Sequence, residues 1–447
     1  MLTSTSCPRR RTARVAAIVG ALALVAASCG GDDDDADDAE PATAEADDTA
    51  ADDTAGDDTA GDEPTADDSG SDDATESEPA ESSDDADEPA GDPIVVGIIT
   101  STSGPLSVYG NTYLEGLEAG LDYATDGTRT VNGHPIELEI VDDGAEPEKA
   151  ISAATDLVGR GVSILAGSVS SGVALQLAPF AEENDILYIS GPAATDGITG
   201  INGNTFRAGR QTYQDVATAS QLLDSVEGSK VLVFAQDGAF GEGNVAAVEA
   251  VLGGAGADVE SLLVPATTTE FTPNAQQILD AAPDLLFVAW AGETTAAMWQ
   301  ALTQQGVFES TTVTTGLGDV ASYSAYGADP TNIKFLSHYA PGTLDNPVND
   351  ALDAAVAQPD LFTPDGFVTA QMIVQALESA EADDVAGMIA ALEGWSFDGP
   401  KGAQEIRASD HAMLQPMFTV TLVGEPGAFE AELIEIIDPA AVAPPEQ

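Results

Sequence analysis

The sequence predicts an α/β protein with two lobes, each built on a doubly wound parallel sheet. From residue 93 onward, short apolar runs rich in β-branched residues alternate with amphipathic stretches over about 355 residues. Apolar strands that alternate with helices are typical of parallel sheets covered on both faces. These strand–helix units form two sets of four or five, and a chain of this length usually builds more than one core.

The apolar and amphipathic runs place the elements in order. Strands are predicted at 94–99, 136–141, 162–167, 186–190, 230–235, 258–264, 284–289 and 311–315. Helices are predicted at 109–124, 147–159, 173–184, 213–226, 242–254, 272–281 and 294–305. The segment 205–213 is interpreted as a crossover between lobes. Later helices at 347–357, 366–379 and 383–393 and a strand at 417–423 are expected to return to both lobes.

The first 28 residues have the pattern of a secretory signal. A cationic patch, RRRTAR, precedes an apolar run that is too short for a permanent membrane span. Small residues at 26–28 stand directly before Cys29, which resembles a bacterial lipobox with Cys29 as the lipidated first residue of the mature chain. The alternative is an ordinary signal peptide with an incidental cysteine. Export by the general or the twin-arginine route stays open.

Residues 29–92 are predicted to be a disordered acidic tether. Residues 30–92 contain 28 of the 77 acidic residues of the chain and no Lys or Arg. Such a segment has too little apolar surface to offset the entropy of ordering it. Calcium binding by the loose ADDTAGDD repeat is the alternative, but the repeat lacks the turn glycine at a set offset that a calcium loop needs.

Charge and cysteine content exclude several classes of function. Only nine Lys and Arg lie beyond the signal, which argues against nucleic acid and anionic lipid as partners. Only Cys29 remains in the mature chain, so no internal disulfide is expected. No zinc spacing, Walker loop or dinucleotide motif occurs, so neither a metal nor a cofactor is predicted.

An enzyme is not expected either. The stretch GSVSSG, 167–172, has the wrong spacing for a nucleophile elbow. None of His134, His338 and His411 falls in a predicted crevice loop, so a Ser–His pair is not predicted.

Ligands of open α/β sheets bind beyond the carboxyl ends of the strands. The segments that follow the predicted strands are 100–110, 167–173, 191–197, 235–243, 289–295 and 315–319, and most are small, hydroxylic and rich in glycine. Hydroxyls and free N–H groups at a helix start suit a carboxylate. This makes Ser170, Ser171 and Thr195 candidates for an anion site, with a plain N-cap role as the alternative.

Seven motifs together resemble the leucine/isoleucine/valine-binding family of type I periplasmic binding proteins, the solute receptors of ABC importers. They are GPLSVYG (104–110), VDDGAEPEKA (141–150), GSVSSG (167–172), PAAT (192–195), FRAGRQTYQD (206–215), DGAFGEG (237–243) and FDGPKG (397–402). The resemblance covers nearly all of 93–440. It implies two lobes joined by three hinge crossovers that close on a small ligand.

The resemblance also implies roles in the first lobe. Tyr109 matches the aromatic residue that covers the ligand from the first loop. Ser171 matches the hydroxyl that binds the ligand carboxylate. Ala193, Ala194 and Thr195 match the loop that binds both the carboxylate and the α-ammonium of an amino acid.

The second lobe departs from the family pattern. Phe240 stands where the family has a tyrosine, and Glu293 stands near another expected aromatic. The acid that would pair with the ammonium is displaced, so Asp319 is the nearest candidate and Glu293 could substitute. Trp290 is either the floor of a side-chain pocket or a core residue. Arg210 either binds a carboxylate or makes a structural pair at the hinge.

The predicted function is therefore an extracytoplasmic, lipid-anchored, monomeric receptor that delivers a small amino-acid-like solute to an ABC permease. A sensory receptor with the same fold, for an amide, a urea-like solute or an aromatic carboxylate, is the alternative. The expected domains are lobe 1 at 93–208 and 336–412, lobe 2 at 209–335 and 413–440, and a tail at 441–447.

Overall fold

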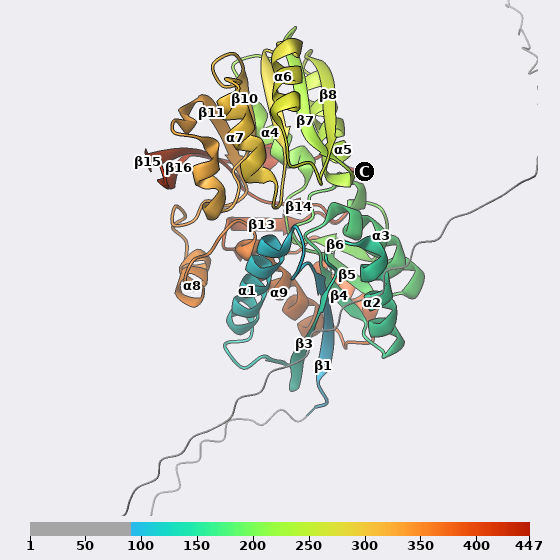
Figure 1. Ribbon diagram of the computed structural model, residues 1–447. Coiled ribbons are helices and arrows are strands. Elements are labelled where there is room, and N and C mark those ends of the chain that lie inside the picture. Colours follow the sequence, from blue (N-terminus) through green and yellow to red (C-terminus); the bar gives the residue numbers. More distant parts are fainter. Residues whose placement is uncertain (1–90) are drawn as a thin grey trace, which may run out of the picture. The chain divides into compact units, whose positions relative to one another are not determined.

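The computed structural model describes residues 91–447 (Figure 1). The predicted signal, the lipidation at Cys29 and the tether up to residue 90 lie outside the described residues. None of the helices within residues 91–447 has both the length and the hydropathy needed to cross a membrane.

Lobe 1 is built on a six-stranded sheet in the order β2-β3-β1-β4-β5-β6. All neighbours are parallel except the short β2, which pairs antiparallel with β3. The strands are β1 (Ile94–Thr100), β2 (Thr130–Val131), β3 (His134–Asp142), β4 (Ile164–Gly167), β5 (Leu187–Ser190) and β6 (Thr205–Arg207). The predicted crossover segment 205–213 therefore begins with three residues of edge strand, because Thr205–Arg207 extend the sheet beside β5.

Helices cover both faces of this sheet, as the apolar strands require. The lobe 1 helices are α1 (Ser107–Ala124), α2 (Pro147–Gly159), α3 (Ser171–Asn184), α9 (Thr363–Ser379) and α10 (Val385–Leu392). One core cluster joins the sheet to α1, α9 and α10, and a second joins it to α2 and α3. Helices α1 and α9 touch backbone to backbone, since a Cβ on Gly116 would lie 1.8 Å from the Thr363 carbonyl oxygen.

Lobe 2 is built on a seven-stranded sheet in the order β16-β15-β11-β10-β9-β7-β8. The five strands from β8 to β11 are parallel, and the hairpin of β15 and β16 adds an antiparallel edge. The strands are β7 (Lys230–Asp237), β8 (Asp258–Pro265), β9 (Leu285–Ala289), β10 (Thr312–Gly316), β11 (Ile333–Ser337), β15 (Met417–Glu425) and β16 (Ala428–Ile437). Both faces again carry apolar clusters.

The lobe 2 helices are α4 (Thr212–Gln221), α5 (Ala239–Val248), α6 (Thr272–Ala281) and α7 (Thr295–Gln304). The helix predicted at 242–254 is thus two pieces, because α5 passes into a π-helical turn at Glu249–Gly253. The helix predicted at 213–226 ends at Gln221, five residues early.

The chain crosses between the lobes three times. It passes from β6 to α4, from β11 to α8 (Pro347–Ala355), and finally through a small sheet to β15. This small sheet consists of β12 (Ser396–Gly399), β13 (Gly402–Ile406) and β14 (Met413–Leu414), none of which the sequence predicted. The predicted architecture of two α/β lobes with three crossovers is confirmed.

Candidate functional site

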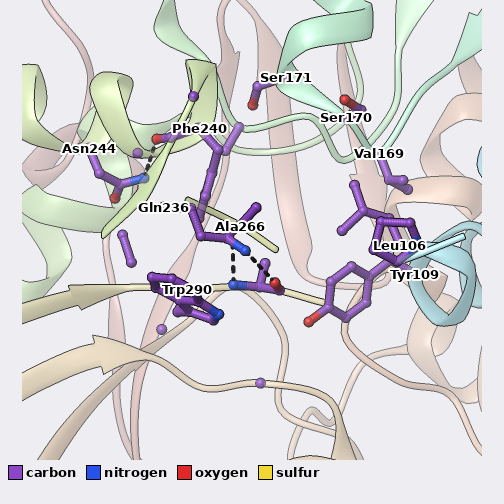
Figure 2. Close-up of a pocket in the computed structure, with 18 of the residues that line it drawn as sticks. Leu106, Tyr109, Val169, Ser170, Ser171, Gln236, Phe240, Asn244, Ala266 and Trp290 are labelled. Atoms are coloured by element: carbon purple, nitrogen blue, oxygen red, sulfur yellow. Dashed lines mark hydrogen bonds between the residues drawn. The ribbon is translucent and has the colours of Figure 1, made fainter. Parts of the chain in front are cut away.

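A cavity of about 720 Å³ lies between the two lobes, a volume within the range of small-molecule sites. Loops that follow β1, β4 and β5 line it from lobe 1, and loops that follow β7, β9, β10 and β11 line it from lobe 2. Figure 2 shows Tyr109, Ser170 and Ser171 of lobe 1 around the same cavity as Phe240 and Trp290 of lobe 2. The cavity therefore occupies the carboxyl ends of both sets of parallel strands, as expected for this class of sheet.

The start of α3 supplies polar groups to the lobe 1 wall. Ser170 caps the helix, since its Oγ accepts a hydrogen bond from the Val173 N–H at 3.4 Å. Ser171 is buried, and its Oγ accepts a hydrogen bond from the Thr195 N–H at 3.3 Å. That bond uses an acceptor position of the Ser171 hydroxyl and leaves its proton to donate. The partial positive charge of the helix start adds to this donor, so the geometry favours an anionic group.

The loop after β5 mainly holds the lobe 1 wall in place, and little of it faces the cavity. Of its three predicted ligand residues, only Ala194 lines the cavity. Ala193 is completely buried, and its carbonyl accepts a hydrogen bond from Arg207 at 2.7 Å. Thr195 Oγ1 accepts a hydrogen bond from the Gly197 N–H at 3.2 Å, which begins a short 3-10 turn. Thr195 thus contacts Ser171 through its backbone rather than the cavity through its hydroxyl.

Tyr109 joins the two lobes. Its ring packs edge-on against Phe362, with centroids 5.1 Å apart, and its hydroxyl oxygen accepts a hydrogen bond from the Gly292 N–H at 3.4 Å. Burial, with a contribution from the negative charge of Asp319, raises the pKa of Tyr109 to about 12. The phenol is therefore neutral at physiological pH.

Trp290 packs within lobe 2 and also lines the cavity. Its ring stacks on Phe234, with centroids 5.4 Å apart, and meets Phe271 edge-on at 5.0 Å, so it belongs to the packing of lobe 2. Its indole N–H donates to Thr294 Oγ1 at 2.9 Å. Trp290 nevertheless lines the cavity, as does Phe240 on α5.

The two acids predicted for an ammonium site lie in different environments. Glu293 is exposed and lines the cavity. Asp319 is not among the lining residues. Its carboxylate accepts a hydrogen bond from the Ser322 N–H at 3.2 Å and caps the 3-10 helix Val320–Tyr326. Burial raises the pKa of Asp319.

Several lining residues were missed at the sequence level. Gln236 follows the apolar part of β7 and holds Ala291 through two hydrogen bonds, of 2.8 and 3.3 Å. Asn244 donates to the Phe240 carbonyl at 2.8 Å, which fixes the first turn of α5. Gln236 lies in the predicted strand-end segment 235–243 but was not named as a site residue, whereas nothing in the local sequence distinguishes Asn244.

The expectation that no histidine lies in a crevice loop is wrong for His338. This residue follows β11, a strand that the sequence did not predict, and it lines the cavity with a 4% exposed side chain. Burial and the nearby positive charges of Arg210 and Lys401 hold the pKa of His338 well below its usual range. His338 is therefore a neutral imidazole near neutral pH.

Arg210 and Asp215 also line the cavity, on the crossover from β6 to α4. The Arg210 Nε lies 3.3–3.4 Å from both carboxylate oxygens of Asp215, and Nη1 donates to the Pro192 carbonyl at 2.8 Å. Burial raises the pKa of Asp215 to about 6, against the opposing effect of Arg210. The hinge pairing of Arg210 that the sequence left open is thus present, and Arg210 still reaches the cavity.

Residues 93–426 match the family model described as periplasmic binding protein. A Leu/Ile/Val-binding protein homologue of Brucella melitensis is 25% identical over 308 residues, which cover 67% of this chain and 83% of that protein. A crystal structure described as an ABC-type branched-chain amino acid transporter of Rhodopseudomonas palustris is 32% identical, with a TM-score of 0.65. The match covers 79% of this chain and 99% of that one.

A second Rhodopseudomonas palustris structure, a solute-binding protein in complex with 4-hydroxybenzoate, has a TM-score of 0.68. It is 23% identical and covers 77% of this chain and 97% of its own, so this likeness shows the fold. The family match spans both lobes and agrees with the sheet orders and the cavity between them. The chain therefore belongs to the periplasmic binding protein family, as a type I solute-binding protein of the branched-chain amino acid transporter group.

Proposed function

We propose that this protein is the extracytoplasmic receptor of an ABC importer, which captures a small amino-acid-like solute between its lobes and delivers it to a permease. The observation that carries this proposal is the cavity of about 720 Å³ that residues of both lobes line together. A ligand that contacts both lobes favours the closed state, because only that state offers all the contacts at once. A permease can then distinguish a loaded receptor from an empty one.

The carboxylate of the solute is proposed to bind at the start of α3. Ser171 has a hydroxyl proton to donate, and Ser170 lies beside it at the N-cap. The Thr195 backbone N–H holds this hydroxyl in position. Charge-assisted hydrogen bonds of this kind contribute roughly 1.5–3 kcal/mol each.

The body of the solute is proposed to lie against lobe 2. Phe240 and Trp290 offer aromatic surface, and Leu317 offers an aliphatic one. For an α-ammonium, the placement of the two predicted acids favours Glu293, because Asp319 already caps its own helix. Of the two predicted acids, Glu293 is therefore the one that can bind an α-ammonium in lobe 2, whereas a simple carboxylate needs no such partner.

The membrane anchor is proposed to be a lipid on Cys29, which lies outside the described residues. The single cysteine after the predicted signal supports this. Wild-type protein expressed in a bacterial host should partition into the detergent phase and the membrane fraction. Wild type should incorporate a labelled fatty acid and Cys29→Ala should not, and equal incorporation into both forms would contradict the anchor.

A thermal-shift screen of ligand-free protein tests the binding function. The panel contains α-amino acids, aromatic acids, amides, ureas and sugars. A ligand at 100 times its dissociation constant adds about 2.7 kcal/mol to the free energy of unfolding, which appears as a raised midpoint. A raised midpoint with carboxylates supports the proposal, and a response only to sugars or ureas contradicts the carboxylate site.

The double variant Ser171→Ala with Thr195→Val tests the site itself. It should weaken carboxylate binding by about tenfold or more, mainly through the lost Ser171 donor. A matched control combines Ser220→Ala with Thr218→Val on α4, where both hydroxyls donate to backbone carbonyls of their own helix and neither residue lines the cavity. Wild-type affinity in the first double variant would show that the start of α3 does not contribute to the binding site.

A further inference from the structure

His338 is a buried side chain that reaches the cavity without satisfying its polar atoms. Within residues 91–447 neither ring nitrogen makes a hydrogen bond; Nε2 is enclosed by protein atoms, whereas Nδ1 keeps some accessible surface. Buried polar atoms are normally paired, and an unpaired one destabilises the protein unless a bound group pairs with it. Since His338 lines the cavity, a bound molecule can supply a hydrogen-bond partner to Nδ1.

The surroundings fix the orientation of this imidazole. Its ring stacks on Phe362, with centroids 5.2 Å apart and planes inclined by 19°. Phe362 is itself held edge-on by Tyr109 and lies under the Arg210 guanidinium, whose Cζ is 5.7 Å from the ring centroid. His338 and Arg210 therefore approach the same aromatic residue.

Arg210 also has donor capacity left. Its Nε pairs with Asp215 and its Nη1 donates to the Pro192 carbonyl, while Nη2 makes no hydrogen bond within residues 91–447. Because Arg210 lines the cavity, as His338 does, these remaining N–H groups can bond the same solute. We propose that Arg210 and His338 form a second polar subsite of the cavity, which binds an uncharged oxygen-bearing group, a hydroxyl or a carboxamide, of the solute.

The charges around the proposed subsite favour an uncharged group of the solute over an anionic one. The positive charge of Arg210 is already balanced by the Asp215 carboxylate, and His338 is neutral because burial and two nearby cations oppose its protonation. A second carboxylate would bring an uncompensated negative charge beside Asp215. A hydroxyl or carboxamide instead accepts a hydrogen bond from Arg210 and satisfies either tautomer of the imidazole.

This inference rests on the proposed function, because it adds a subsite to the same binding cavity. It narrows the solute to a carboxylic acid that carries a second, neutral polar group. A site with buried polar atoms discriminates strongly against an analogue that lacks their partner. The preference among matched acids is therefore the quantity to measure.

Titration calorimetry of the full-length protein with two series of acids tests the subsite. One series is leucine, glutamine and glutamate, and the other is benzoate, 4-hydroxybenzoate and terephthalate. In at least one series the neutral polar member should bind about tenfold more tightly than both the apolar and the doubly anionic members. Tightest binding of glutamate or terephthalate would overturn the inference.

His338→Phe tests the residue, because phenylalanine keeps the stacking on Phe362 and removes both ring nitrogens. The advantage of the neutral polar acid should fall to within about twofold, mostly by loss of its own affinity. His411→Phe is the matched control. His411 is also buried and stacked on a phenylalanine, Phe206, but lies outside the cavity, with ring nitrogens 3.0 Å from the Thr205 carbonyl and 3.4 Å from Glu393.

Nitrogen NMR of histidine-labelled wild-type protein gives a readout that needs no folded variant. The ring signals of His338 should shift with the neutral polar acid and stay in place with its apolar analogue. Unchanged preference in His338→Phe, or unshifted His338 signals, overturns the subsite and leaves the receptor function standing. If neither these six acids nor any acid of the thermal-shift panel binds to the wild type, the proposed carboxylate receptor fails and the subsite with it.

Discussion

The hydroxyl oxygen of Tyr109 in lobe 1 lies 3.4 Å from the backbone nitrogen of Gly292 in lobe 2 and accepts its hydrogen bond. The same loops approach at a second point, where a Cβ on Gly292 would lie 2.8 Å from the Pro105 carbonyl oxygen. Helices α3 and α5 also touch across the interface between the lobes. The two lobes are thus in contact on more than one side of the cavity, which is the arrangement expected of a closed receptor.

Tyr109→Phe should weaken solute binding about fivefold, because the closed state loses one hydrogen bond of about 1 kcal/mol. The effect should appear mainly in the dissociation rate, measured by stopped flow. Tyr123→Phe on the same helix is the control, since the Tyr123 side chain is 43% exposed and does not line the cavity. Equal dissociation rates in the two variants would show that the contact does not stabilise the closed state.

Gly292→Ala should weaken binding about tenfold or more, since the added methyl group meets the Pro105 carbonyl only when the lobes are together. Gly292 has a φ of +85°, which alone makes alanine costly by about 1–2 kcal/mol. Gly342→Ala controls for that cost, because Gly342 has a φ of +69° and no atom within 4 Å of the added Cβ. The two variants should show similar losses in the free energy of unfolding measured with urea, but only Gly292→Ala should bind the solute more weakly. Equally weakened binding in Gly342→Ala would contradict the steric explanation.

Trp290 should report ligand binding through its fluorescence, because it lines the cavity, unlike Trp299 and Trp395. The emission change on binding should disappear in Trp290→Phe and persist in Trp299→Phe and Trp395→Phe. Trp290→Phe should also lower the affinity, since a smaller ring leaves part of the cavity wall open. A signal that survives in Trp290→Phe would place the ligand away from this wall.

Asp142 should stabilise the β1–α1 loop in a manner that depends on pH. Its carboxylate accepts hydrogen bonds from the Thr102 and Ser103 N–H groups at 2.9 and 3.1 Å, and from Lys149 Nζ at 2.8 Å. Its partners, Lys149 and the Ser103 hydroxyl foremost, hold the pKa of Asp142 far below its usual range. This stability is therefore present above about pH 4, the unfolded-state pKa, and is lost as the pH falls through the lower folded-state pKa.

Asp142→Asn should accordingly cost about 1–3 kcal/mol at pH 7, and the difference from wild type should shrink as the pH falls below 4. Urea unfolding across this pH range measures it. Glu137→Gln, on the same strand and exposed, should leave the unfolding free energy within about 0.5 kcal/mol of wild type. A loss in Asp142→Asn that is independent of pH would assign it to packing instead of charge.

Apolar runs were sufficient to locate most of the elements, because strands buried on both faces are continuous in sequence. The helix predicted at 147–159 coincides with α2, and the strand predicted at 94–99 is β1 but for its last residue. Strand β11 was not predicted because Lys334 interrupts its apolar run. In the structure the Nζ of Lys334 donates a hydrogen bond to the Leu222 carbonyl. Strand β16 was not predicted because it lies at the edge of the sheet, where its exposed glutamates interrupt the apolar run.

The same reasoning explains which site residues could be predicted. The start of α3 could be predicted as part of the site, because the end of one strand and the start of the next helix are both recognisable in the sequence. His338 was not, since its position depends on the unpredicted β11. The direction of a side chain in a loop is set by its tertiary partners, and no sequence pattern shows that Asp319 bonds Ser322 instead of lining the cavity.

Calorimetric titration with an acid selected by the thermal-shift screen, beside its methyl ester, tests the central claim most directly. The ester keeps the body of the solute and removes the negative charge that the start of α3 is proposed to bind. The account predicts one bound acid per protein and at least tenfold weaker binding of the ester. Equal affinity for acid and ester would contradict a carboxylate site between the lobes.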